Sequence, residues 1–214
     1  AFFLIVYSLY FLSGRQLKLQ NRILLVASCV FYGWWDWRFL SLLFLTIGVD
    51  YYIGLAIDQT EDEKKRKLLL AVSIISNLSV LIFFKYFNFF NDNVQRLLTY
   101  FGAESHKSAL NIVLPLGISF YTFQSMSYTI DVYRRQLVPV RNVFDFALYV
   151  TYFPQLVAGP IERATHLIPQ VISSRKIKPD EFYEGCYLLF WGLFKKVVVA
   201  DNLARVAHEV YLSP

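Results

Sequence analysis

The residues best suited to chemistry lie in the sequence FPQLVAGPIER, which ends at Arg163. Pro154 and Pro160 interrupt helical hydrogen bonding, and Gly159 allows another part of the backbone to approach closely. Glu162 and Arg163 then place opposite charges next to an apolar run. Irregular backbone at membrane depth must be buried in protein or line a wet cavity, because lipid cannot satisfy its hydrogen bonds. The segment therefore indicates either a path for a polar substrate or acyl donor, or a simple re-entrant corner.

Other polar residues interrupt otherwise apolar stretches. Asp50 lies in VDYYIG, where it is either an acid that lines a cavity or pins helices together, or an acid at the membrane interface. The run Ser119–Ser127, SFYTFQSMS, includes Gln124 and several hydroxyls that could help helices pack. Asp131 precedes two arginines at the spacing of helical ion pairs, so a surface pair is the simpler interpretation.

Signatures of soluble enzymes are missing from the sequence. It contains no Walker loop, dinucleotide fingerprint, Gly-x-Ser-x-Gly or Cys-x-x-Cys motif. His106, His166 and His208 lie in polar surroundings and not at metal-ligand spacing, so we interpret them as solvated and expect no metal site. Lys195 and Lys196 either snorkel to the membrane surface or meet the phosphates of a cytosolic donor.

The composition explains what kind of scaffold must position these residues. Of 214 residues, 56% are hydrophobic and only 17% are charged, whereas soluble domains contain about 25% charged residues. Disorder is excluded by the apolar content, and two cysteines, Cys29 and Cys186, exclude a disulfide framework. The net charge of +5 comes from short basic clusters between apolar runs, which indicates a polytopic membrane protein rather than a nucleic-acid partner.

Several apolar stretches approach the roughly 20 residues that cross a bilayer. The candidate spans are Ile23–Trp35, Phe39–Ile57, Leu68–Phe84, Ile112–Ile130, Val143–Ile161 and Phe182–Ala200, after a short first helix at Phe2–Leu12. Phe83–Phe101 is expected to be an amphipathic helix in the membrane interface, and Val143–Gln170 a re-entrant segment. The predicted fold class is an all-α, polytopic integral membrane protein with interfacial and re-entrant helices, in one membrane domain over residues 1–214.

The basic residues predict an orientation. If Phe2–Leu12 runs inward, fourteen Lys and Arg residues fall on the inner side of the membrane. The four on the outer side are Arg38, Lys85, Arg96 and Lys107. Because cytoplasmic loops carry the excess of Lys and Arg, the N-terminus is predicted to be extracytoplasmic.

The sequence resembles the membrane-bound O-acyltransferases, and within them the bacterial subgroup of the alginate O-acetyltransferase membrane subunit and its peptidoglycan-acetylating relatives. The resemblance runs along nearly the whole chain. It is densest in three blocks, Val113–Arg135, Asp145–Arg163 and Gly192–Ala204. The earlier segments ASCVFYGWWDWRF and FFKYFNFF also resemble the family.

This resemblance implies a ring of helices in the bacterial inner membrane around a tunnel. Such proteins move an acyl group, typically acetyl in this subgroup, from a cytosolic thioester donor to hydroxyls of an extracytoplasmic polysaccharide. The implied donor is acetyl-CoA or an acyl carrier, which acts as a substrate, and no bound cofactor is implied. The implied partners are membrane lipids, the polysaccharide acceptor and a periplasmic acyltransferase, with no nucleic acid.

The family's key histidine lies in a later region beside a tryptophan, and no Trp-His pair occurs here. We therefore expect an N-terminal portion, truncated at both ends and inactive alone, with the catalytic histidine beyond Pro214. The alternatives are a transporter or channel-like protein, and a non-catalytic scaffold for a partner enzyme. Within this chain the candidates for a tunnel or donor path are Gln124, Asp131, Pro154, Gln155, Gly159, Pro160, Glu162 and Arg163.

Overall fold

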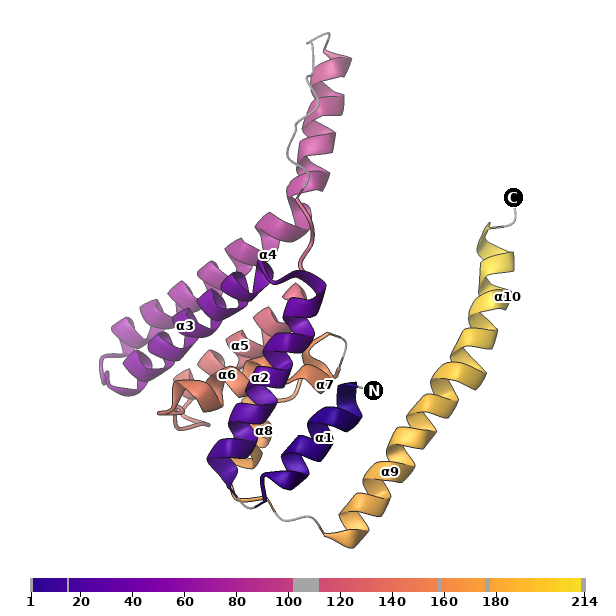
Figure 1. The fold of residues 1–214 in the computed structure, drawn as a ribbon. Helices are drawn as coiled ribbons and strands as arrows, with labels where there is room; N and C mark the ends of the chain where they lie inside the picture. Colours follow the sequence, from indigo (N-terminus) through magenta and orange to yellow (C-terminus); the bar gives the residue numbers. More distant parts are fainter. Residues whose placement is uncertain (1, 15, 102–111, 158, 176–177, 213–214) are drawn as a thin grey trace. The chain divides into compact units, whose positions relative to one another are not determined.

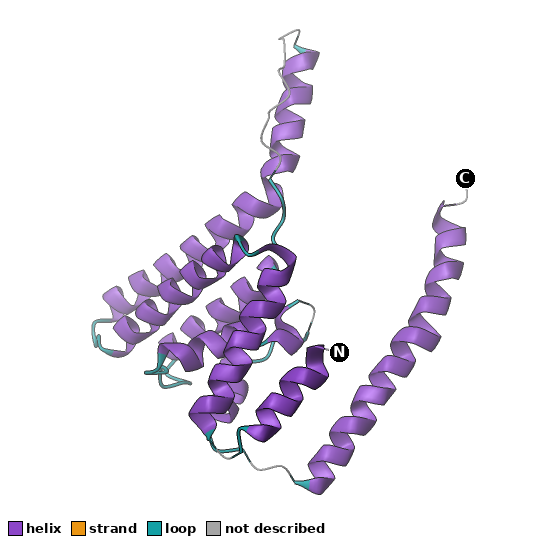
Figure 2. Cartoon of the chain, in the orientation of Figure 1, coloured by secondary structure: helices purple, strands orange, loops and turns teal. Residues whose placement is uncertain are grey.

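The computed structural model describes residues 2–14, 16–101, 112–157, 159–175 and 178–212 (Figure 1). These residues form helices joined by short loops, and no strand occurs among them (Figure 2). The helical part of the predicted fold class is thus confirmed. The chain divides into two compact units, Ala1–Ser174 and Arg175–Pro214, each described by itself below. That the whole chain forms a single membrane domain stays a prediction.

The first unit contains eight helices within its described residues. They are α1 (Phe2–Leu12), α2 (Leu17–Asp36), α3 (Phe39–Asp58), α4 (Glu63–Tyr100), α5 (Ile118–Tyr133), α6 (Val143–Thr151), α7 (Phe153–Leu156) and α8 (Ala164–Ile172). The centre of the unit is the packing of α3, α4 and α5, against which α6 and α8 lie. Its buried core includes Leu43, Ile47, Tyr128, Phe146 and Tyr149.

Two helices in the described part of the chain, α3 and α4, are long and apolar enough to cross a membrane. They contain the predicted spans Phe39–Ile57 and Leu68–Phe84. These helices fit a helical membrane protein by length and composition. The 38 residues of α4 would extend about 57 Å at 1.5 Å per residue, well beyond a hydrocarbon core of about 30 Å.

The structure corrects two of the predicted elements. The stretch Ile112–Ile130 is not one span, because α5 begins only at Ile118, after Gly117 in the left-handed conformation (φ 72°). Its 16 residues are mostly buried, so α5 is a core helix. The stretch Phe83–Phe101 is not a separate interfacial helix but the continuation of α4, because neither proline nor glycine interrupts that helix.

The predicted re-entrant segment does break, as its prolines suggested. Helix α6 ends at Thr151, and the four-residue α7 follows directly after Tyr152, with Pro154 in its first turn. The backbone N–H of Phe153 donates to Ser28 Oγ at 3.1 Å, which ties this break to α2. A smaller apolar cluster of Val6, Ala27 and Phe153 holds α1 to the same place.

The second unit consists of α9 (Pro179–Phe194), a π-helical segment η1 (Lys195–Ala200) and α10 (Asp201–Leu212). The predicted span Phe182–Ala200 is helical and divided between α9 and η1. None of the described side chains of these elements is buried, and α9 exposes apolar residues such as Tyr187 and Phe190. Lys195 lies over the Trp191 ring at 5.6 Å, and Lys196 pairs with Asp201.

Candidate functional site

Among the charged residues that the structure describes, Asp50 is the most deeply buried, with an exposed fraction of 0% in the middle of α3. From α4, Ser73 Oγ donates to Asp50 Oδ1 at 2.6 Å, and Asn77 Nδ2 lies 2.9 Å from Oδ2. From α5, Ser125 Oγ donates to Oδ2, and Thr129 Oγ1 lies 3.0 Å from Ser73 Oγ. We name Asp50, Ser73, Asn77, Ser125 and Thr129 the Asp50 cluster.

The hydrogen bonds of the Asp50 cluster distinguish an acid that pins helices together from an acid at the membrane interface. A carboxylate that accepts hydrogen bonds from two neighbouring helices joins three helices through one group. Buried polar groups of this kind are stable only when their donors and acceptors are paired. Asp50 therefore pins helices together, and the interfacial interpretation is wrong.

The run Ser119–Ser127 mainly serves packing, as expected. Ser125 belongs to the Asp50 cluster, and Ser127 Oγ donates back to the carbonyl of Gln124 at 2.8 Å. Gln124 is 1% exposed, and its Nε2 donates to the carbonyl of Tyr149 at 2.7 Å. These contacts fix α5 against both α3 and α6.

A second polar site is centred on the hydroxyl of Tyr149, which is fully buried on α6. The hydroxyl oxygen lies 3.2 Å from the carbonyl oxygen of Gln124 and 3.3 Å from that of Glu162. Ser127 Oγ lies 3.3 Å away on the same side. Two of the candidate path residues, Gln124 and Glu162, are thereby brought together by a residue that we did not select from the sequence.

The segment between α7 and α8 folds tightly onto α7. A Cβ at Gly159 would lie 2.6 Å from Gln155 Cα, so only glycine fits there. Gln155 is buried, and its Nε2 has no hydrogen-bond partner in the described part of the chain. Pro154 and Pro160 are exposed. This geometry forms a tight corner that contains one buried amide without a partner among the described residues.

Asp131 lies in the last turn of α5, a helix that packs against α8. It is 8% exposed, and its Oδ2 is buried without a hydrogen bond to any described residue. Burial raises the pKa of Asp131, and the nearby positive charges of Arg163 and Arg134 oppose that rise. The predicted surface pair of Asp131 with Arg134 and Arg135 is wrong, because Asp131 is buried and Arg135 pairs with Glu61 at 3.3 Å.

The two histidines that the structure describes, His166 and His208, are exposed. His166 is exposed on α8, and its Nδ1 lies 3.2 Å from Glu162 Oε2. His208 is exposed on α10, and His106 lies outside the described residues. Over the ranges that the structure covers, no three His, Cys, Asp or Glu side chains gather in a way that could hold a metal ion.

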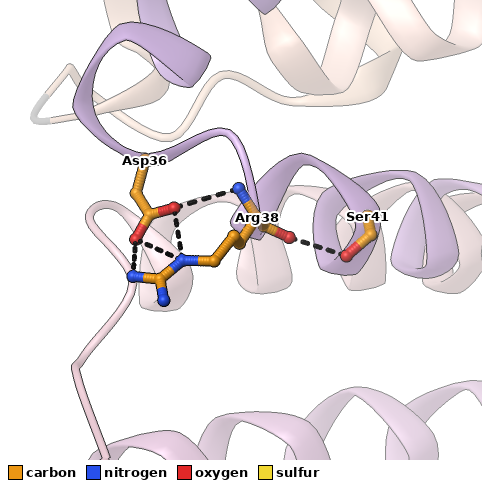
Figure 3. Close-up of polar contacts among 3 residues, drawn as sticks. All are labelled: Asp36, Arg38 and Ser41. Carbon is orange, nitrogen blue, oxygen red and sulfur yellow. Dashed lines mark hydrogen bonds and ion pairs between the residues drawn. The ribbon is translucent and has the colours of Figure 1, made fainter.

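The corner between α2 and α3 carries an exposed ion pair (Figure 3). Asp36 accepts from Arg38 Nε at 2.9 Å, from Nη2 at 2.6 Å and from the Arg38 backbone N–H at 3.0 Å. Hydrogen bonding by Arg38 lowers the pKa of Asp36. Ser41 Oγ donates to the Arg38 carbonyl at 2.7 Å, and the Trp34 and Trp37 rings next to this pair are exposed.

Arg66 and Asn21 are two further buried residues that the sequence analysis missed. Arg66, one of four consecutive basic residues, is 3% exposed and donates to the carbonyls of Ile57 and Tyr133, each at 2.7 Å. Asn21 is buried on α2, and its Nδ2 donates to Asp145 Oδ1 at 2.8 Å. Nothing in the residue types near them distinguishes these two from solvated neighbours.

The fold and its polar clusters define a helical membrane-type protein whose buried carboxylate, amide and hydroxyl groups join helices. Two of its relatives are named "Probable alginate O-acetylase AlgI". The one from Pseudomonas putida is 42% identical over 95% of this chain, and the one from Pseudomonas aeruginosa is also 42% identical over 95%. A "Peptidoglycan O-acetyltransferase" from Helicobacter pylori is 34% identical over 86% of this chain.

The chain is thus homologous to these O-acetylases over nearly its whole length, which confirms the resemblance. It covers 41% of the Pseudomonas putida relative, 38% of the Pseudomonas aeruginosa relative and 39% of the Helicobacter pylori relative, so it spans about two fifths of their length. No protein-family profile matches the chain, and no solved structure matches it.

Proposed function

We propose that this chain is part of a membrane O-acetyltransferase of the bacterial inner membrane. The complete protein passes an acetyl group from a cytosolic thioester donor, acetyl-CoA or an acyl carrier, to hydroxyls of an extracytoplasmic polysaccharide. The observation that carries this proposal is the identity of 42% to alginate O-acetylases over 95% of the chain. A periplasmic acyltransferase is the proposed partner for the acceptor step.

The reaction sets requirements that this chain meets only in part. The acceptor hydroxyl oxygen attacks the thioester carbonyl, the C–S bond breaks, an ester C–O bond forms, and the hydroxyl proton passes to the departing thiolate. A positioned histidine with a pKa near 7 suits that proton transfer. His166 and His208 are both exposed, so neither is positioned as that base within the described residues, and we propose that the base belongs to the part of the relatives' length that this chain does not cover.

The role that remains for this chain is to build scaffold and part of the donor path. The Tyr149 site, with Gln124 and Glu162, and the buried amide of Gln155 are the polar groups that support such a path. Asp131 and Arg163 lie at its charged end. These groups donate or accept hydrogen bonds and thereby orient a bound molecule, which is a positioning role and not a chemical one.

The test uses the complete protein in membrane vesicles whose cytosolic face is accessible. Acetyl-labelled coenzyme A is added to that face, together with polysaccharide and the periplasmic partner on the other. We expect base-labile label on the polysaccharide. Unmodified substrate that crosses without label would favour a transporter, and partner binding without any transfer would favour a scaffold.

The isolated 214 residues provide the second arm of this test. They are expected to give no transfer above background, because no positioned base is present among their described residues. Turnover by the isolated chain that is lost on His166→Gln would overturn the placement of the base while leaving the transferase proposal intact.

A further inference from the structure

Helix α8 begins at an N-terminus that carries no side-chain cap. Arg163 is the N-cap residue of this nine-residue helix, and its side chain makes no capping hydrogen bond. The first hydrogen bonds of the helix run from the N–H groups of His166 and Leu167 to the carbonyl of Arg163. Earlier N–H groups have no partner within a helix, and the helix dipole adds partial positive charge, so such an end attracts anions.

Two arginines, Arg134 and Arg163, lie within electrostatic reach of one carboxylate, that of Asp131. Arg134 is the C-cap residue of α5, and α5 packs against α8. Both arginines are exposed, and within the ranges that the structure describes neither forms a salt bridge. Their neighbour Arg135, in contrast, pairs with Glu61. Unpaired guanidinium groups offer a phosphate charge-assisted and bidentate hydrogen bonds.

Asp131 is a buried acceptor without a donor. It is 8% exposed, and its Oδ2 has no hydrogen-bond partner among the described residues. Leaving a buried acceptor unpaired is unfavourable, so this oxygen indicates an O–H or N–H group that a bound molecule supplies. The other acid at the start of α8, Glu162, differs in this respect, since its Oε2 lies 3.2 Å from His166 Nδ1.

These groups together suit a molecule with two polar parts. The two arginines and the N-terminus of α8 suit a phosphate, and Asp131 suits a hydroxyl or amide N–H beside it. Phosphopantetheine has both parts, because its phosphate is joined by a short carbon chain to a hydroxyl and to amide N–H groups. The same arm carries the acetyl thioester in acetyl-CoA and on acyl carrier proteins, so both proposed donors present this chemistry.

We propose that the start of α8 binds the phosphopantetheine arm of the donor, with the phosphate at Arg134, Arg163 and the N-terminus of α8, and an O–H or N–H group at Asp131. The identity of the donor rests on the proposed acetyl transfer. The predicted orientation places both arginines on the cytoplasmic side, where a cytosolic donor arrives. The three side chains bind and orient the arm and take no part in the chemical step.

The test is isothermal titration calorimetry of the complete protein in mild detergent. The probes are S-methyl phosphopantetheine and S-methyl pantetheine, two thioethers that differ only in the phosphate. Arg163→Gln and Arg134→Gln are each expected to raise the Kd of the phosphorylated probe about tenfold, because each removes a charge-assisted hydrogen bond. Neither variant should change the Kd of S-methyl pantetheine.

Asp131 is tested with the probe that lacks the phosphate. Asp131→Leu is expected to raise the Kd of S-methyl pantetheine about tenfold, because the acceptor for its O–H or N–H group is lost. The same variant should retain the melting temperature of the parent protein, since Oδ2 has no donor among the described residues. If Asp131 only oriented the arginines, the Kd of S-methyl pantetheine would remain unchanged, and the proposed contact would be wrong.

Arg135→Gln is the matched control, because Arg135 is the next residue of the same charge and pairs with Glu61. Its Kd values should equal those of the parent protein. A Kd for phosphopantetheine that is insensitive to both Arg134→Gln and Arg163→Gln would overturn the site. Inorganic phosphate that binds as tightly as S-methyl phosphopantetheine would also overturn it, since the site would then hold an anion only.

Two further titrations distinguish the sources of the arm. S-methyl coenzyme A and a carrier protein that bears the S-methyl arm are compared, and the donor is the one whose Kd rises with Arg163→Gln. Labelled acetyl transfer by the parent protein is measured in parallel. Transfer together with variant-insensitive binding would overturn this site and leave the proposed function intact, whereas variant-sensitive binding without any transfer would support the site and overturn the proposed function.

Discussion

Asp50 joins three helices through the hydrogen bonds that its carboxylate accepts. Replacing it by leucine leaves the Ser125 hydroxyl and one N–H of Asn77 without their acceptor in a dry interior, at about 1–3 kcal/mol each, whereas Ser73 Oγ keeps Thr129 Oγ1 at 3.0 Å. We expect Asp50→Leu to lower stability by a total of about 2–6 kcal/mol. Asp50→Asn keeps one acceptor oxygen and should cost less. The measurement is the melting temperature of the purified protein in detergent.

The control for this prediction is Asp58→Asn at the end of α3. Asp58 pairs with Arg141 at 3.3 Å on the exposed surface, and such pairs contribute about 0–1 kcal/mol. Equal melting temperatures for Asp50→Leu and Asp58→Asn would show that the Asp50 cluster does not hold the helices together.

Arg66 is a buried cation held by carbonyl groups. It donates to Ile57 and Tyr133 near the C-terminal ends of α3 and α5, where helix dipoles favour positive charge, and it lies 5.7 Å from the Tyr133 ring. A hydrogen bond to a charged group is worth about 1.5–3 kcal/mol, so Arg66→Met should be destabilising by at least that much. Arg66→Lys should recover only part of the lost stability, since lysine lacks the planar guanidinium group that donates to both carbonyls.

Lys65→Met is the matched control, because Lys65 is the exposed neighbour in the same basic run. Its melting temperature should remain that of the parent protein. An Arg66→Met variant as stable as Lys65→Met would mean that the carbonyl contacts of Arg66 contribute nothing.

Among the helices, Gly117 and Gly48 lead to opposite predictions for the effect of an alanine substitution on stability. Gly117 precedes α5 with φ 72°, and a Cβ there would lie 2.6 Å from the carbonyl oxygen of Leu156. Gly117→Ala should therefore cost more than about 1 kcal/mol. Gly48→Ala lies inside α3 with free space around it and should stabilise by up to about 1 kcal/mol, because alanine is the better helix former.

Chemical denaturation in a mild detergent, followed by circular dichroism, measures both changes. Opposite signs are expected for the two variants. If both glycines were equally tolerant of alanine, the close approach of the α5 start to α7 would have no energetic consequence.

At the scale of the whole molecule, the charge distribution predicts the orientation in the membrane. The loop between α3 and α4 should be cytoplasmic. A Glu61→Cys variant, at a side chain that is 92% exposed, should resist an impermeant thiol reagent in intact cells when Cys29 and Cys186 are serine. Trp34→Cys lies at the corner between α2 and α3, which is at the other end of α3 from Glu61, and should react.

Disruption of the cells provides the control for reactivity, since both cysteines should then be labelled. Ready labelling of Glu61→Cys from outside intact cells would overturn the predicted orientation. Labelling of both sites from outside would argue against a bilayer between them.

Local features of the sequence predict the helical class, the long apolar stretches of α3 and α4, and the break after α6. These properties are local, since apolar length, proline and glycine act on the residues beside them. The same local reasoning failed at the start of α5, because the left-handed turn at Gly117 depends on its contact with Leu156. It failed again at Phe83–Phe101, where the polar residues did not end the helix.

The hydrogen-bond partners of the buried polar residues follow only from the tertiary structure. Asp50 and Ser125 are 75 residues apart, and Arg66 and Tyr133 are 67 residues apart, so no local pattern could pair them. Burial removes water as the alternative partner, and each polar group must then find its donor or acceptor across the helix packing. For this reason Arg66 is buried while its neighbour Lys65, of the same charge, is exposed.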